Sequence, residues 1–282
     1  MKRIFYTLTF CSVFILCTCD VLDDINLFSL QDDVALGEQV ALEIANDPYN
    51  YPILNNPTLK SNINSRIFQQ VLASSKVEHK DVFQYHIEII NDDNTMNAFA
   101  IPGGRVYVYT GLIKYLDSED ALAGVIGHEI AHIENRHSTE RLTQYYGVSL
   151  LLSIVLGDNP DEITEIVANL FVGLAFLANS RSDEDEADSD SFEYLRDTRF
   201  YPGGVKFFFE ELQFDGYVES SSPVATFFST HPDPYDRITN VSNFCTNNGY
   251  SNITYDNTTY TYNGTTLTLY KSEYQTYIIS KL

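Results

Sequence analysis

The sequence predicts an α+β fold that is mostly helical and contains a small sheet. Two observations predict it: apolar residues recur at helical spacing in several long segments, and short runs rich in β-branched and aromatic residues cluster between positions 82 and 109. The chain has 282 residues, 44% of them hydrophobic, which suffices for the core of one large domain or two small ones.

The first half of the chain predicts two helices followed by three strands. In the first helix, apolar side chains repeat every three or four positions, and Asp32 and Asp33 favour its start through the helix dipole. A polar turn separates the first two strands, and Pro102-Gly103-Gly104 ends the second. The predicted helices are 31–46 and 58–75, and the predicted strands are 82–90, 96–101 and 105–109.

The second half of the chain predicts more helices. Asp117 and Ser118 are favourable N-caps for one that follows a short helix ending near Leu116. Another, 16 residues long, is apolar but short for a membrane span, so we expect a buried helix there. A Ser-rich loop is expected at 219–223. The predicted helices are 119–135, 146–156, 163–178, 181–196 and 205–212.

Beyond Cys245 the composition shifts to Thr, Tyr and Asn. Asn263-Gly264 between two alternating runs is typical of a type I′ turn, so we expect a hairpin of residues 259–262 and 265–270. We interpret residues 245–282 as a small β-hairpin appendage to a domain that spans residues 19–244. Cys245 itself is expected to be a buried, idle thiol.

The N-terminus has the pattern of a bacterial secretory leader. Two basic residues precede an apolar run, residues 4–18, that is too short for a comfortable membrane span. Leu16-Cys17-Thr18-Cys19 resembles a lipoprotein signal, which implies cleavage of residues 1–18, a lipid on Cys19 and a membrane-anchored position in the bacterial cell envelope, at the periplasm or the outer membrane. A plain signal peptide and an uncleaved anchor are the alternatives.

The chain is strongly acidic. Its formal net charge is −22, because 39 Asp and Glu outnumber 17 Lys and Arg. The phosphates of a nucleic acid would repel such a surface, so the sequence argues against a nucleic-acid partner. Attraction to anionic lipid through a basic patch is unfavourable for the same reason. The expected contact with a membrane is therefore the lipid anchor on Cys19.

The pattern His128-Glu129-Ile130-Ala131-His132 is the candidate metal-binding motif of the sequence. On a helix, a spacing of four residues places both imidazoles on one face, one turn apart, where they can bind one metal ion. Glu129 is rotated by one position and can reach a water on that metal. Because two imidazoles and a carboxylate are unfavourable to bury without a partner, we interpret the pattern as a metal site rather than as an amphipathic helix with incidental histidines.

A catalytic zinc ion needs a third protein ligand and an open position. The acidic segment 184–188 offers Glu184 and Asp188 on one helix face, so that one could bind the metal and the other could accept the ring N–H of a metal-bound His. Spacing alone does not separate Glu184 from Glu186. His137 is expected to point elsewhere on the helix, in a structural or surface role.

These residues lie within a longer resemblance to the M48 family of zinc metallopeptidases, over about residues 32–240. The C-terminal segment beyond Cys245 has no counterpart that we recognise in the family. The segments that resemble family motifs are 97–104 and 106–112 before the active-site helix, Ser180-Arg181 with 184–188, and 229–232 with Arg237.

The resemblance implies a zincin-like metallopeptidase fold, with a mixed sheet over the active-site helix, and one Zn²⁺ per chain. Matched residue by residue, it makes Glu184 the third zinc ligand beside His128 and His132. It also makes Asp188 the carboxylate that holds a metal-bound His. His231 could stabilise the developing oxyanion, occupy the open metal position in a resting state, or be an ordinary turn histidine.

We therefore expect a zinc-dependent endopeptidase in which Glu129 is the general base on a zinc-bound water. The expected substrates are polypeptides, namely unfolded or misassembled envelope proteins that lie extended against the strand near residues 97–100. One alternative is an envelope chaperone or assembly factor with suppressed proteolysis. Another is a small-substrate metallohydrolase that uses the same site.

Overall fold

The structure is a computed structural model. Several predicted features lie outside the described residues: the leader, the lipid-anchor residue Cys19, the apolar helices at 146–156 and 163–178 and the loop at 219–223. Every described helix is either too short or too polar to cross a bilayer. The described residues are 26–144, 179–217, 224–232, 234–256, 259–262 and 265–282.

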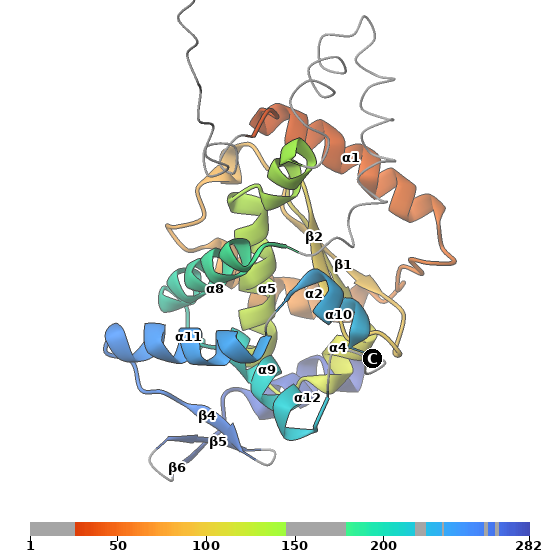
Figure 1. Cartoon of the computed structure of the whole chain (residues 1–282). Coiled ribbons are helices and arrows are strands. Elements are labelled where there is room, and N and C mark those ends of the chain that lie inside the picture. Colours follow the sequence, from red (N-terminus) through yellow and green to blue (C-terminus); the bar gives the residue numbers. More distant parts are fainter. Residues whose placement is uncertain (1–25, 145–178, 218–223, 233, 257–258, 263–264) are drawn as a thin grey trace, which may run out of the picture.

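The first three strands form one mixed sheet in the order β1-β3-β2. β1 (His86–Ile90) runs parallel to β3 (Arg105–Tyr109), and β2 (Ala98–Ile101) pairs with β3 in the antiparallel direction. β2 therefore lies at an edge of the sheet (Figure 1). The α+β class, with mostly helices and a small mixed sheet, is confirmed.

β1 starts four residues later than the sequence predicts. Residues 82–85 form a turn that follows a short 3-10 helix, His79–Asp81. Two contacts hold this 3-10 helix: Glu134 accepts the backbone N–H of Glu78 at 2.7 Å, and Lys80 donates to the carbonyl of Ser74 at 2.8 Å. These partners are distant or non-periodic in the sequence, so the alternating pattern of residues 82–85 did not reveal them.

Helices cover both faces of the sheet (Figure 1). α1 (Leu30–Asn46) packs Leu36 and Val40 against Phe99 and Tyr107 on one face. On the other face, residues of β1 and β3 share the main core with α5 (Glu119–Glu134). The predicted helix 58–75 forms as one helical run with a π-helical middle. Its parts are α2 (Pro57–Ile63), η2 (Asn64–Phe68) and α3 (Gln69–Leu72).

α5 is the central helix of the fold and is buried along its whole length. It follows α4 (Thr110–Tyr115), and the hydroxyl of Ser118 caps it by accepting the N–H of Ala121. Two later helices pack against it, α8 (Arg181–Arg196) and α9 (Val205–Phe214). The predicted boundaries of all these helices agree with the structure to within two residues.

α5 and α9 approach closely at Gly124. A Cβ added there would lie 2.0 Å from the backbone nitrogen of Val205, whereas a Cβ added at Gly127 would meet the hydroxyl of Ser191, which can rotate away. We expect Gly124→Ala to lower the free energy of unfolding by about 3 kcal/mol and Gly127→Ala by about 1 kcal/mol or less. Urea denaturation measures both. Equal midpoints for Gly124→Ala and the wild type would contradict this packing.

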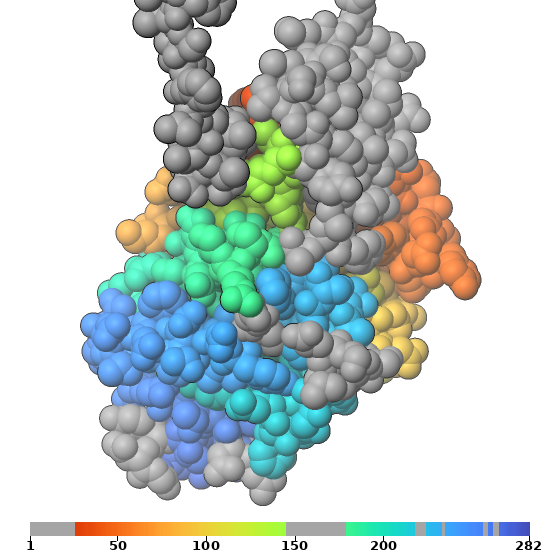
Figure 2. Space-filling view, viewed as in Figure 1, coloured from red at the N-terminus to blue at the C-terminus, as the bar shows by residue number. Residues whose placement is uncertain are grey.

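Three helices after residue 224 were not predicted. They are α10 (Ala225–Thr230), α11 (Pro234–Asn247) and α12 (Lys271–Tyr277), and a last 3-10 turn follows, η4 (Ile279–Lys281). α11 lies against α8, and the two helices are side by side on the face that Figure 2 shows. α11 also carries the free cysteine Cys245, which is buried as expected.

The predicted hairpin is present and joins a third strand. β4 (Thr254–Asp256), β5 (Thr259–Tyr262) and β6 (Thr265–Leu267) form an antiparallel sheet. β6 is three residues shorter than predicted, because Leu269 and Tyr270 adopt positive φ and lead into α12. The side chains of Tyr260 and Tyr274 are fully buried in the main core, so this segment packs onto the rest of the chain.

Candidate metal centre

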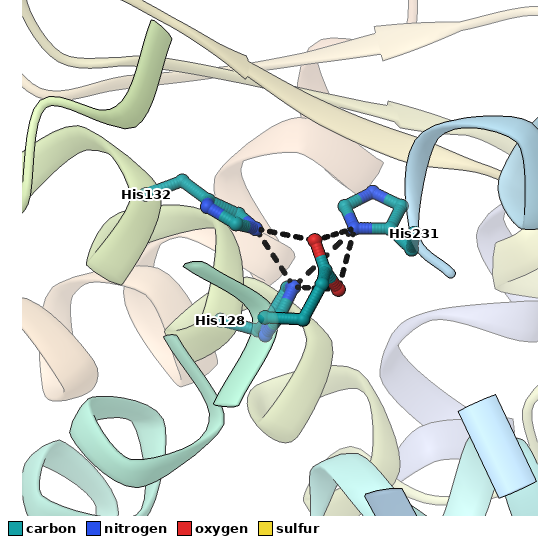
Figure 3. A group of neighbouring side chains, drawn as sticks. His128, His132 and His231 are labelled. Carbon is teal, nitrogen blue, oxygen red and sulfur yellow. Dashed lines mark hydrogen bonds and ion pairs between the residues drawn. The ribbon is translucent and has the colours of Figure 1, made fainter. Parts of the chain in front are cut away.

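Among the described residues, the side chains of His128, His132, Glu184 and His231 converge at one buried point, with one ligand atom of each within 4.8 Å of the others. His128 and His132 come from α5, and Glu184 comes from α8. His231 ends α10. Figure 3 shows the three imidazoles facing one another around a carboxylate.

Local signals in the sequence place these side chains. Ser118 starts α5, so the two histidines fall one turn apart on the same face of that helix. Ser180 starts α8 with a capping box to Asp183, which sets Glu184 in the first turn and turns it inward. Burial then separates the two candidate glutamates: Glu184 is buried, whereas the side chain of Glu186 is 58% exposed.

The spacing of the ligand atoms fits a metal ion. Bonds of about 2.0–2.1 Å in a tetrahedral zinc site put neighbouring ligand atoms roughly 3.3 Å apart. Here the Nε2 atoms of His128 and His132 are 2.9 Å apart, and each lies 3.4 Å from a carboxylate oxygen of Glu184. Lone pairs of nitrogen and oxygen that meet in a buried site repel one another unless a proton or a metal cation lies between them. The donor set therefore suits a divalent cation.

A buried ion pair surrounds His128. Its Nδ1 lies 2.9 Å from Oδ1 of Asp188. Arg237 of α11 donates to both oxygens of Asp188 at 2.7 Å, and its third nitrogen donates to Glu184. All these groups are buried. Arg237 belongs to a segment that resembles the family, and the structure places its ion pairs directly beside the cluster.

The charges of the cluster shift the pKa values of its members. Burial and Arg237 lower the pKa of His128, but the two carboxylates beside it outweigh them and raise it to about 9. Burial would raise the pKa of Glu184, but the imidazoles and the guanidinium hold it well below its usual range. The pKa of His132 is lowered well below its usual value by burial and by His128. Glu184 is therefore a carboxylate in this site.

Glu129 faces the cleft beside the cluster. Its side chain is buried, its Oε1 makes no hydrogen bond to the described residues, and Nε2 of His231 lies 3.6 Å from that oxygen. Burial raises the pKa of Glu129. The cleft is also lined by Phe99 and Ala100 of β2, and by Asn179. A buried carboxylate oxygen without a partner fits a site built for a water or a substrate atom.

A mixed sheet over a helix with the pattern His-Glu-x-x-His, and a carboxylate supplied by a second helix, define a metallopeptidase. The chain belongs to peptidase family M48, whose model matches residues 58–244.

Two groups of relatives show how far the likeness extends. The mitochondrial metalloendopeptidase OMA1 of Schizosaccharomyces pombe is 30% identical over 176 residues, which cover 62% of this chain and 50% of the relative. The beta-barrel assembly-enhancing protease of Escherichia coli is 29% identical over 201 residues, which cover 68% of this chain and 40% of the relative. The chain thus spans about half or less of the length of these relatives.

The structure brings together the residues that the sequence singled out: His128, Glu129, His132, Glu184 and His231. Sequence reasoning missed two neighbours of this cluster: Asn179, whose Nδ2 lies 3.2 Å from Nε2 of His132, and His137. His137 was expected to point away in a structural or surface role, but it is buried and its Nδ1 lies 2.7 Å from Nδ1 of His132. This hydrogen bond between His137 and His132 depends on a turn after α5, which the helical periodicity of the sequence does not predict.

Proposed function

We propose that the chain is a zinc-dependent endopeptidase, with one Zn²⁺ per chain held by His128, His132 and Glu184. The observation that carries the proposal is the buried convergence of these three side chains, at spacings that suit tetrahedral zinc, beside a glutamate with an unpartnered oxygen. Zinc is favoured over harder cations because two of the three ligand atoms are imidazole nitrogens.

When bound, zinc supplies Lewis acidity, which lowers the pKa of water and polarises a peptide carbonyl. Glu129 takes the proton of the attacking water and then delivers it to the leaving nitrogen. Its raised pKa suits both steps, because a carboxyl group whose pKa lies nearer the working pH both accepts and releases a proton readily. Asp188 accepts the Nδ1–H of His128, so that the Nε2 lone pair of this ring faces the metal.

His231 has two candidate roles that predict opposite results. Its Nδ1 lies 3.4 Å from Nε2 of His128 and 3.1 Å from Oε1 of Glu184, which supports a resting state in which it fills the open metal position. Stabilising the oxyanion would require it to move off the cluster. We propose the resting-state role for this conformation and the oxyanion role for the opened one.

Replacing His231 by Ala separates these roles. If filling the open position is the dominant role, casein cleavage by His231→Ala should equal or exceed the wild-type rate, because the position is then always open. If oxyanion stabilisation dominates, the rate should fall about 100-fold or more. Initial rates at saturating zinc measure the difference, with His86→Ala, on the exposed start of β1, as the matched control.

The proposed substrates are unfolded or misassembled proteins of the bacterial cell envelope. β2 is an edge strand and lines the cleft beside Glu129, so an extended polypeptide could add to it through backbone hydrogen bonds. The name of the Escherichia coli relative, a beta-barrel assembly-enhancing protease, supports an envelope setting. The leader and a lipid on Cys19 would anchor the chain to the membrane there.

A degradation assay tests the proposal. The full chain should degrade unfolded casein, lose that activity when a zinc chelator is added, and regain it when zinc is restored. Hydrolysis of small peptides alone, with intact casein left uncut, would favour a small-substrate hydrolase. Rescue of an envelope defect by a Glu129→Gln variant would favour the chaperone alternative, because that variant lacks the proposed base.

A further inference from the structure

α5 ends in a turn that returns the chain to the metal cluster. After Glu134 and Asn135, Arg136 adopts φ of 60°, a left-handed conformation that a residue with a side chain rarely takes. Asp33 of α1 holds it there through contacts to Nε at 2.5 Å and to a terminal nitrogen at 3.1 Å. Because of this turn, His137 leaves the path of the helix and lies against His132.

The contacts of His137 form a chain of two hydrogen bonds. Its Nδ1 lies 2.7 Å from Nδ1 of His132, and its Nε2 lies 3.3 Å from Oε2 of Glu186. Both rings are buried. The hydrogen bond to Glu186 lowers the pKa of that carboxyl group, as expected for a carboxylate that accepts a proton from the ring.

The tautomers of His132 and His137 follow from the role of His132 as a metal ligand. If Nε2 of His132 offers its lone pair to a metal, the ring proton must sit on Nδ1. Nδ1 of His137 must then accept it, which leaves the proton of His137 on Nε2, directed at Glu186. For two neutral rings at 2.7 Å, this is the one assignment that keeps the Nε2 lone pair of His132 turned to the cluster.

We propose that His137 is a positioning residue for the metal centre: it fixes the tautomer and the ring orientation of His132, with Glu186 fixing its own tautomer in turn. The inference rests on the proposed function, because it requires His132 to bind the metal. It gives each histidine ligand a separate support. His128 has the buried carboxylate Asp188, and His132 has an imidazole backed by a partly exposed carboxylate.

Zinc affinity of the full chain tests this, measured by competition with a chromophoric chelator. Replacing His137 by Leu removes the acceptor and should weaken zinc binding about 10–100-fold, the usual effect of losing a group that holds a metal ligand. His137→Asn keeps an acceptor near the position of Nδ1 and should lose less than about 10-fold. Glu186→Ala should fall between the wild type and His137→Leu.

Two further measurements make the result specific to positioning. His86→Leu, which removes an exposed histidine from β1, should bind zinc like the wild type. The visible spectrum of bound Co²⁺ should change in His137→Leu, because it reports ligand geometry. Should His137→Leu fail to fold, as judged by circular dichroism without metal, His137→Asn and Glu186→Ala decide the matter: wild-type zinc affinity in both would overturn the inference.

The outcomes separate this inference from the proposed function. Wild-type protein that binds zinc tightly, together with a folded His137→Leu variant of affinity within twofold and an unchanged Co²⁺ spectrum, would overturn the positioning role alone. Wild-type protein that binds no zinc would overturn both. Weaker binding by His137→Leu, with partial recovery in His137→Asn, would support the inference.

Discussion

Glu129→Gln should bind zinc as the wild type does and lose proteolysis by a factor of about 100 to 10,000, the usual contribution of a general base. The amide has nearly the shape of the carboxylate, so the helix and the cluster beside it should remain intact. It cannot take a proton from water at neutral pH. The measurements are zinc content after dialysis and the initial rate of casein cleavage at saturating zinc.

A matched control isolates the effect of position. Glu193→Gln makes the same chemical change on α8, where the carboxylate is partly exposed and pairs with Arg196. It should cleave casein at the wild-type rate. A Glu129→Gln protein that holds zinc and cleaves within about threefold of the wild type would remove Glu129 from the proposed chemistry.

Glu184→Ala should lose both metal and activity. It removes a direct ligand, so zinc affinity should fall by more than the roughly 100-fold upper range seen when only a supporting group is removed. Arg237 would keep its two contacts to Asp188 at 2.7 Å, so the fold should survive the change. Zinc per chain after dialysis, measured by elemental analysis, should drop from one to near zero.

Glu193→Ala is the matched control for that loss, because it removes a carboxylate from the same helix at a partly exposed position. It should retain one zinc per chain. A Glu184→Ala protein that is folded and still carries one tightly held zinc would show that another residue completes the site. Circular dichroism of both variants distinguishes loss of metal from loss of structure.

Much of the fold was visible in the sequence because the signals are local. Ser118 and Ser180 mark the starts of α5 and α8, and the structure has both caps. α11 is polar for most of its length, and its contacts include the fully buried Val241 and Cys245 and the ion pairs of Arg237. Such a helix depends on its tertiary contacts rather than on its own pattern, so periodicity did not predict it.

Some features of the candidate site are likewise local and visible in the sequence, whereas others depend on packing. The spacing of His128 and His132 is a property of one helix, so the sequence shows it directly. The choice of Glu184 over Glu186 depends on which face of α8 meets α5, and only packing decides that. The contact of His137 depends on a left-handed Arg136, and Asp33, which holds it, is 103 residues away in the chain.

The most direct test of the metal centre is a crystal structure of the zinc-loaded chain, with anomalous diffraction measured at the zinc absorption edge. We expect one zinc ion per chain, bound by Nε2 of His128, Nε2 of His132 and a carboxylate oxygen of Glu184 at about 2.0–2.2 Å. Absence of anomalous density between the two imidazoles, or a Glu184 side chain turned away into solvent, would contradict the proposed site.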